Sequence, residues 1–402
     1  MSVPSLKSIV ASNFLFQNNI PNILSDLKEK TPDEVREYVE IFSRYLSPKT
    51  LEKFESDPEF LFSDDKEIDD NMFLDLIKNA FIRKRFLTEK SFLKLLFLSI
   101  RKGFSLSIKY LLKESLLKSF NIVNDFSIVI VNKTIFRLTP LMLAVHTNNL
   151  DAIKELISSG ATVDQQNKAG GTALFAAALR GRLEAIKELI SSGATVDQRN
   201  NNGETALIAA ALRGHPEAIK ELISSGATVD QRNNDGATAL FAAAQRGYPE
   251  AIKELISSGA TVNLRDNDGA TALFAAALRG HPEAIKELIS SGATVDQRNN
   301  NGATALFAAA LRGHPEAIKE LISSGATVDL QNNDGQTALF AAAQGGQPEA
   351  IKELISSGAT VNLRDNYRKT ALSSTSWRGK PIEVQEELIS AGADNPVACR
   401  IL

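Results

Sequence analysis

The chain has 402 residues, and its hydrophobic content of 43% is enough to build a packed core, which excludes wholesale disorder. Lys and Arg number 45 and Asp and Glu number 48, so the net charge of −3 gives no global attraction to nucleic acid. The one cysteine, Cys399, leaves no intramolecular disulfide, and we therefore expect a protein of a reducing compartment, the cytoplasm.

Neither a membrane span nor a signal sequence is indicated. The longest apolar run, residues 93–100, is far shorter than the roughly 20 residues that cross a bilayer. The first residues, MSVPSLKSIVASNFLF, have one lysine and no clear small-residue cleavage site, so they favour a soluble protein over a secreted one.

Residues 1–88 are predicted to form a small helical region. Thr31 followed by Pro32 is a helix start, and residues 64–86 have the pattern of another helix. Residues 52–75 are strongly acidic and residues 78–118 strongly basic. We interpret these runs as two solvated helix faces that attract each other, and the alternative is a basic patch for an anionic partner.

Residues 89–121 are predicted to be a degenerate capping unit of the repeat that follows them. Residues 102–112 (KGFSLSIKYLL) overlay on residues 213–223 (RGHPEAIKELI) of that repeat. Terminal units of a repeat array are atypical, because one of their faces lacks a partner. An extended insertion, residues 122–133, then carries the apolar segment FSIVIV.

Residues 134–397 repeat one phrase eight times. A glycine and a threonine each recur every 33 residues, and the last unit slips by one residue, since its glycine is Gly392. A catalytic site needs one set of residues once, so the repetition indicates a repeated physical unit. The glycines are Gly160, Gly193, Gly226, Gly259, Gly292, Gly325 and Gly358, and the threonines are Thr139, Thr172, Thr205, Thr238, Thr271, Thr304, Thr337 and Thr370.

Each unit is predicted to be a pair of short helices. Thr205 can cap a first helix, residues 206–212, and Pro216 fits the first position of a second helix. Gly226 ends that helix as a left-handed cap, and the polar residues 233–236 (NNDG) supply a tight turn. Such a pair cannot bury its own apolar face, so it must stack on its neighbours as a solenoid.

The period and several motifs resemble the ankyrin repeat. The opening of the first unit (Thr139, Pro140, Leu141) and the Gly-His and Gly-Ala pairs at residues 214–215 and 226–227 carry the resemblance, which covers about two thirds of the chain. The family's proline after threonine is alanine in units two to eight. Its histidine is replaced by Phe175, Ile208, Phe241, Phe274, Phe307 and Phe340.

This resemblance implies an all-α ankyrin-repeat solenoid of stacked helix pairs with β-turn fingers, preceded by the small helical region. It implies a non-catalytic scaffold for protein–protein interaction, which we expect to be a monomer. The near-identical units are also similar to those of ankyrin-repeat proteins of intracellular bacteria and large viruses. The alternative is therefore a host-directed effector or adaptor, secreted into a host cell, whose N-terminal region carries an activity or recruits host machinery.

No residue pattern predicts an enzyme, a cofactor or a metal site. Three of the four histidines (His215, His281 and His314) share one repeat position, which favours a structural role. There is no Cys/His cluster with zinc spacing, no phosphate-binding glycine loop after a strand, and no motif that pairs a nucleophile with a histidine.

Two series of arginines are the candidate binding residues. One series ends the first helix, where family structures present side chains on the concave face, and a second series (Arg199, Arg232, Arg265, Arg298 and Arg364) enters the turn. We predict a basic groove that binds an acidic peptide or protein and no nucleic acid; the alternative is that each arginine satisfies carbonyls or acids of the adjacent unit. The first series is Arg180, Arg213, Arg246, Arg279 and Arg312.

The tail, residues 398–402, ends in CRIL. This fits the prenylation motif C-a-a-X with Cys399 as the acceptor, and a terminal leucine favours a geranylgeranyl group. Arg400 is not aliphatic and no polybasic stretch precedes it, so a chance match is the alternative. Membrane association is expected only if Cys399 is prenylated.

Overall fold

The computed structural model describes residues 89–117, 127–131, 134–375 and 382–394. The chain divides into two compact units, Met1–Ala161 and Thr162–Leu402, which are described separately. The predicted helical region 1–88 and the tail 398–402 with Cys399 lie outside the described residues. Among the helices in the described part of the chain, none has both the length and the apolar character that a membrane crossing requires.

The first unit contains two helix pairs. Helices α6 (Glu89–Lys102) and α7 (Ser105–Leu117) form one pair, and α8 (Pro140–His146) and α9 (Leu150–Ser158) form the other. Helix α6 contacts α8 and α7 contacts α9, as in a stack of repeats. Both α6 and α7 fall within the predicted capping unit 89–121, and Leu95, Ile100 and Ile108 on them are fully buried. The division of the chain into domains stays a prediction.

A β-hairpin begins within the segment predicted as an extended insertion, residues 122–133. Strand β1 (Ser127–Val131) pairs antiparallel with β2 (Thr134–Leu138), with Ser127 opposite Leu138 and Val131 opposite Thr134. Residues 134–138, which the prediction assigned to the first repeat, form the second strand of this hairpin, and the boundary at residue 133 stays a prediction. A strand requires a partner to satisfy its backbone groups, and here the partner is the segment immediately after it.

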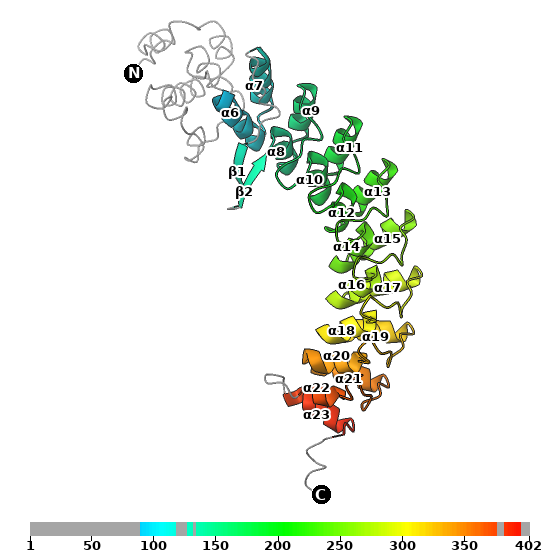
Figure 1. Ribbon diagram of the computed structural model, residues 1–402. Coiled ribbons are helices and arrows are strands. Elements are labelled where there is room, and N and C mark those ends of the chain that lie inside the picture. The colour runs from blue at the N-terminus through cyan, green and yellow to red at the C-terminus, as the bar shows by residue number, and fades with distance from the viewer. Residues whose placement is uncertain (1–88, 118–126, 132–133, 376–381, 395–402) are drawn as a thin grey trace, which may run out of the picture. The chain divides into compact units, whose positions relative to one another are not determined.

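In the second unit, short helices alternate between two rows (Figure 1). Each helix contacts the next helix of its own row, and each pair is packed internally. The first-helix row is α10 (Ala173–Leu179), α12 (Ala206–Ala211), α14 (Ala239–Arg246), α16 (Ala272–Arg279), α18 (Ala305–Arg312), α20 (Ala338–Gly345) and α22 (Ala371–Ser374). The second-helix row is α11 (Leu183–Ser191), α13 (Pro216–Ser224), α15 (Pro249–Ser257), α17 (Pro282–Ser290), α19 (Pro315–Ser323), α21 (Pro348–Ser356) and α23 (Ile382–Ser390).

The helix ends follow the predicted chemistry. The hydroxyl oxygen of Thr205 accepts a hydrogen bond from the N–H of Ile208, and the same cap opens the other first helices. Pro216 occupies the start of α13, where its missing N–H leaves no bond unmade. Gly226 has a φ of +94°, the left-handed conformation predicted for the end of that helix.

Alanine-rich first helices allow the repeats to pack closely. In α14, Ala242, Ala243 and Ala244 are buried, and in the second helix α15 the buried residues are Ala251, Ile252 and Leu255. Burial of each large aliphatic side chain contributes about 1.5–3 kcal/mol, and much of this apolar surface is shared with the adjacent repeat. Stacking is therefore a condition of folding for each pair.

Two ladders of hydrogen bonds join consecutive repeats through the fingers, the turns between one helix pair and the next. At each fingertip, an asparagine N–H and its side-chain amide donate to carbonyl oxygens of the preceding finger; Asn267 bonds to Asp235 O at 3.0 Å and to Asn234 O at 2.9 Å. The tip asparagines are Asn201, Asn234, Asn267, Asn300, Asn333 and Asn366.

The second ladder lies at the base of the fingers. The N–H and hydroxyl of Thr228 donate to the carboxylate of Asp197, with the hydroxyl contact at 2.6 Å, and the same pairing recurs between most neighbouring units. Asparagine replaces the aspartate twice: Asn263 accepts from Thr294 N–H and donates to Gly292 O, and Asn362 accepts from Asp394 N–H and donates to Gly392 O. Each repeat is therefore fixed to the next by polar bonds as well as by apolar contact.

The Gly-His pair of the repeat is an inter-repeat contact. Gly247 has a φ of +71°, and a Cβ built on it would lie 2.5 Å from the ring of His281 in the next repeat. Burial lowers the pKa of His281, while its hydrogen bond to the backbone of Gln245 opposes that shift. The structural role predicted for these histidines is thus explained, because the ring covers a glycine backbone.

Gly247→Ala is expected to lower the free energy of unfolding by about 2–5 kcal/mol. The positive φ costs about 1–2 kcal/mol for an L-residue, and displacing the His281 ring adds an overpacking cost of about 1–3 kcal/mol. The control is Gly259→Ala, which has a φ of +94° but no neighbour within 4 Å, and should cost about 1–2 kcal/mol. Denaturant unfolding followed by circular dichroism measures both, and equal losses would contradict the packing role of the contact.

Candidate protein-binding groove

A groove of about 660 Å³ runs between the fingers and the first-helix row of the second unit. Its floor comes from the first helices α12, α14 and α16, and its wall comes from the fingers that precede and follow them. The lining residues are Glu204, Ile208, Leu212, Asn233, Asp235, Ala237, Phe241, Ala242, Gln245, Arg246, Asp266, Asp268, Ala270, Phe274, Ala275, Leu278, Asn299 and Asn301.

The floor of the groove is apolar. Phe241 and Phe274 stand at the same position of successive first helices, and both rings are half-buried. Leu212 and Leu278 extend this surface one helical turn further on, while Gln245 takes the same place in the repeat between them. Half-exposed aromatic and aliphatic side chains in a hollow are typical of a surface that binds another molecule.

Sequence reasoning had treated these phenylalanines as helix residues compatible with stacking and had missed their place on the floor. Phe175 and Phe307 are half-buried in the same way, whereas Ile208 and Phe340 are buried. The signal was present, since a large apolar residue replaces the family's histidine at this position. The repeat pattern alone does not show which side of a short helix stays open.

The finger wall carries carboxylates. Asp266 Oδ1 accepts hydrogen bonds from Ala270 N–H at 2.8 Å and Asp268 N–H at 3.0 Å, and Glu204 accepts one from the Asn200 side chain at 2.8 Å. Burial raises the pKa of Asp266, and the two backbone hydrogen bonds oppose that shift. Asp235 and Asp268 are exposed at their fingertips.

All five arginines of the first series are exposed at the ends of their helices, and Arg246 is the one that lines the groove. Desolvation, followed by the charges of Arg182 and Arg213, lowers the pKa of Arg180, so positive charge accumulates between consecutive repeats. The arginines Arg180, Arg213, Arg246, Arg279 and Arg312 thus lie at the C-terminal ends of successive first helices, and we call this series the arginine edge. Their role in binding stays a prediction.

The second arginine series has a structural role instead. Arg199 Nε donates to Gly203 O of its own finger, and its Nη2 donates to Arg232 O and to Asn234 Oδ1 of the next finger. Arg232 repeats this with Gly236 O and Arg265 O. These guanidinium groups satisfy carbonyls of adjacent units, which was the alternative weighed for both series.

Comparison with known proteins agrees with this architecture. The sequence model of the family described as "Ankyrin repeats (3 copies)" matches residues 96–200, 174–266, 242–332 and 308–398. The chain belongs to the ankyrin-repeat family. The fold is the predicted all-α ankyrin solenoid of stacked helix pairs, with the β1–β2 hairpin added.

Two solved ankyrin structures are similar to the chain. The ankyrin repeat domain of human ASB11 is 30% identical, with a TM-score of 0.50, and the match covers 56% of this chain and 99% of that one. The ankyrin repeat domain of Bcl-3, described as a unique member of the IkappaB protein family, is 27% identical with a TM-score of 0.47, covering 55% and 100%. A comparison with curated protein sequences found no match.

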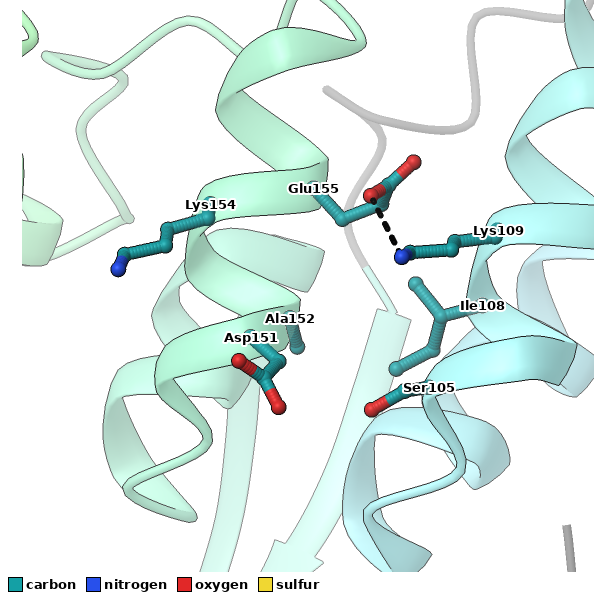
Figure 2. A pocket seen from close by; sticks show the side chains of 7 residues that line it. All are labelled: Ser105, Ile108, Lys109, Asp151, Ala152, Lys154 and Glu155. Atoms are coloured by element: carbon teal, nitrogen blue, oxygen red, sulfur yellow. Dashed lines mark ion pairs between the residues drawn. The ribbon is translucent and has the colours of Figure 1, made fainter.

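A smaller hollow of about 290 Å³ lies in the first unit between helices α7 and α9 (Figure 2). Lys109 and Glu155 face each other across it, with Nζ and Oε2 4.0 Å apart. Its lining balances Lys109 and Lys154 against Asp151 and Glu155, so it carries no net charge that would select a ligand. Within the described ranges, no group of three or more acidic, histidine or cysteine side chains is placed to hold a metal ion.

Asp266→Asn is expected to raise stability at neutral pH by up to about 0.5 kcal/mol. An amide can accept the same two N–H bonds without a partly buried charge, as at Asn200, Asn233, Asn299 and Asn332, the equivalent positions of other fingers. Because the pKa of Asp266 is raised in the folded protein, folding favours the protonated carboxyl, and wild type gains stability relative to the variant as pH falls through that pKa.

Thermal unfolding of both proteins between pH 3 and pH 8 measures this difference. The stability advantage of the variant should shrink towards the acid end, where both side chains are neutral. A variant that is less stable than wild type at neutral pH would show that the Asp266 charge stabilises the finger.

Proposed function

We propose that this protein is a non-catalytic scaffold that binds a partner protein along the groove of the second unit. Ankyrin repeats generally mediate protein–protein interaction. The observation that carries the proposal is the floor of half-exposed phenylalanines, Phe241 and Phe274, flanked by exposed charged residues. Protein interfaces have this composition, an apolar centre rich in aromatic residues inside a polar rim.

The exposed arginine series supplies one side of that rim. We propose that Arg213, Arg246 and Arg279 pair with carboxylates of the partner, since exposed guanidinium groups form bidentate hydrogen bonds with them. The protein would act as a monomer, with the groove of one chain forming the binding surface.

A host-directed effector or adaptor is the second candidate. The sequence features that favour it are the distinct composition of residues 1–88 and the near-identity of the repeats. In that role the array would select a target while residues 1–88 deliver an activity or recruit host machinery, and prenylation of Cys399 would add a membrane contact.

Expression of wild type and Cys399→Ser in a eukaryotic cell tests whether Cys399 is prenylated. A larger membrane-bound fraction of wild type is the result expected of a lipid anchor, and equal membrane-bound fractions of the two proteins would contradict it.

Charge reversal of Arg213, Arg246 and Arg279 to Glu is expected to weaken partner binding at least about tenfold. Each exposed charge pair is worth about 0.2–1 kcal/mol, and reversal replaces attraction by repulsion. The measurement is affinity purification of the tagged full chain from eukaryotic cells, with co-purified proteins quantified by mass spectrometry.

The matched control reverses Lys220, Lys253 and Lys286 to Glu. These lysines are exposed on the second helices of the same repeats, so the change in net charge is identical but lies away from the groove. The proposal predicts that the control keeps its partners. Binding through the arginine edge would be contradicted if the arginine variant kept its partner proteins, or if both variants lost them equally.

A further inference from the structure

The two sides of the groove differ in charge. The finger side carries Glu204, Asp235, Asp266 and Asp268, whereas Arg246 is the one cation in the lining. At neutral pH the lining of the groove is therefore acidic, whereas the arginine series in the sequence had led us to predict a basic groove. The potential inside a hollow follows the charges that line it, so the groove itself attracts cations.

The arginines of the fingers do not cancel this charge inside the groove. None of Arg199, Arg232 and Arg265 is among its lining residues. Their guanidinium groups donate to finger carbonyls such as Gly203 O, Gly236 O and Gly269 O. In contrast, the carboxylates of Asp235 and Asp268 are exposed and, within the described part of the chain, accept no hydrogen bond and form no ion pair.

The spacing of the floor indicates an elongated ligand. Helices packed side by side lie about 8–10 Å apart, and Phe241 and Phe274 stand on neighbouring helices. A chain in the extended polyproline II conformation advances about 3.1 Å per residue with three residues per turn, so every third side chain of such a chain points the same way and would reach the next repeat. The basic side chains would then fall between the apolar ones, towards the fingers.

We propose that the groove binds an extended segment of a partner protein that carries Lys or Arg side chains and apolar side chains, each about every third residue. The basic groups pair with Asp235, Asp268 and Glu204, and the apolar groups lie on Phe241 and Phe274. This inference rests on the proposed scaffold function and adds to it the chemistry of the segment inside the groove. Acidic groups of the same partner would meet the arginine edge.

The chain offers a matched pair of substitutions for the test. Asn202 and Asn301 occupy the positions of Asp235 and Asp268 in the neighbouring fingers. The double variant D235N/D268N therefore removes two charges while keeping a side chain that the repeat already accommodates. The control, E217Q/E250Q, removes two exposed charges from the second helices α13 and α15.

The probes are three synthetic peptides of about twelve residues, long enough to span about four repeats in the polyproline II conformation. Each has Leu and Thr at fixed positions and Lys, Gln or Glu at every third residue. Fluorescence anisotropy with the full chain gives the affinities at two salt concentrations. We expect the Lys peptide to bind most tightly and the Glu peptide least, with D235N/D268N weakening the Lys peptide about three- to tenfold and leaving the Gln peptide unchanged.

The outcomes separate this inference from the scaffold function. The proposal that the bound segment is basic would be overturned if the Glu peptide bound most tightly. It would also be overturned if D235N/D268N and E217Q/E250Q changed the affinity of the Lys peptide equally. If the triple arginine variant still loses its protein partners in that case, the scaffold function stands. Failure of all three peptides to bind would overturn the inference, and retained partners in the arginine variant would overturn the arginine edge as well.

Discussion

One asparagine at the tip of each finger ties its repeat to the repeat before it. Its backbone N–H and its side-chain amide both donate to the preceding finger, for example from Asn300 to Asp268 O and Asn267 O, each at 3.0 Å. A change in the tilt of one repeat would break these bonds to its neighbour, and each such intramolecular hydrogen bond contributes about 0.5–1.5 kcal/mol. The ladder thus holds the fingers in register, and the apolar contacts between helices supply most of the stability.

This register explains why the groove has an apolar floor, a basic edge and an acidic edge, each made of a different kind of residue. When repeats are held at a fixed offset, side chains at one repeat position form a row, and each row acquires its own chemistry. The phenylalanines form a floor, the exposed arginines at the helix ends form one edge, and the fingertip carboxylates of Asp235 and Asp268 form the other. The same register places Arg232 against the carbonyls of the next finger, where it contributes to stacking and not to the rim.

The fold was largely predictable because its determinants are local. The Thr205 cap, the Pro216 start and the left-handed Gly226 each depend on a few adjacent residues, and all three were confirmed. The hairpin was not predicted, because residues 127–131 pair with residues 134–138 and the sequence analysis had placed those residues in the first repeat. The two arginine series looked equivalent in sequence, since their difference depends on carbonyls of another repeat.

The binding surface was less predictable for a related reason. Charge within each unit is nearly balanced, so composition gives no sign of where acids and bases lie. Asp268 and Arg246 line opposite sides of one groove, yet they belong to different repeats and are separated by many residues of sequence. The basic groove predicted from the arginines alone therefore omitted the carboxylates that the fingers bring to it.

Hydrogen exchange at the fingertips tests most directly the claim that the ladder couples the repeats. The amides of Asn234, Asn267 and Asn300 lie at exposed positions in turns but donate to the preceding finger. The account predicts that in the full chain they exchange as slowly as amides of the neighbouring first helices, because both open only when the stacking is lost. Exchange at the rate of an unprotected loop, with the helices still protected, would contradict the coupling.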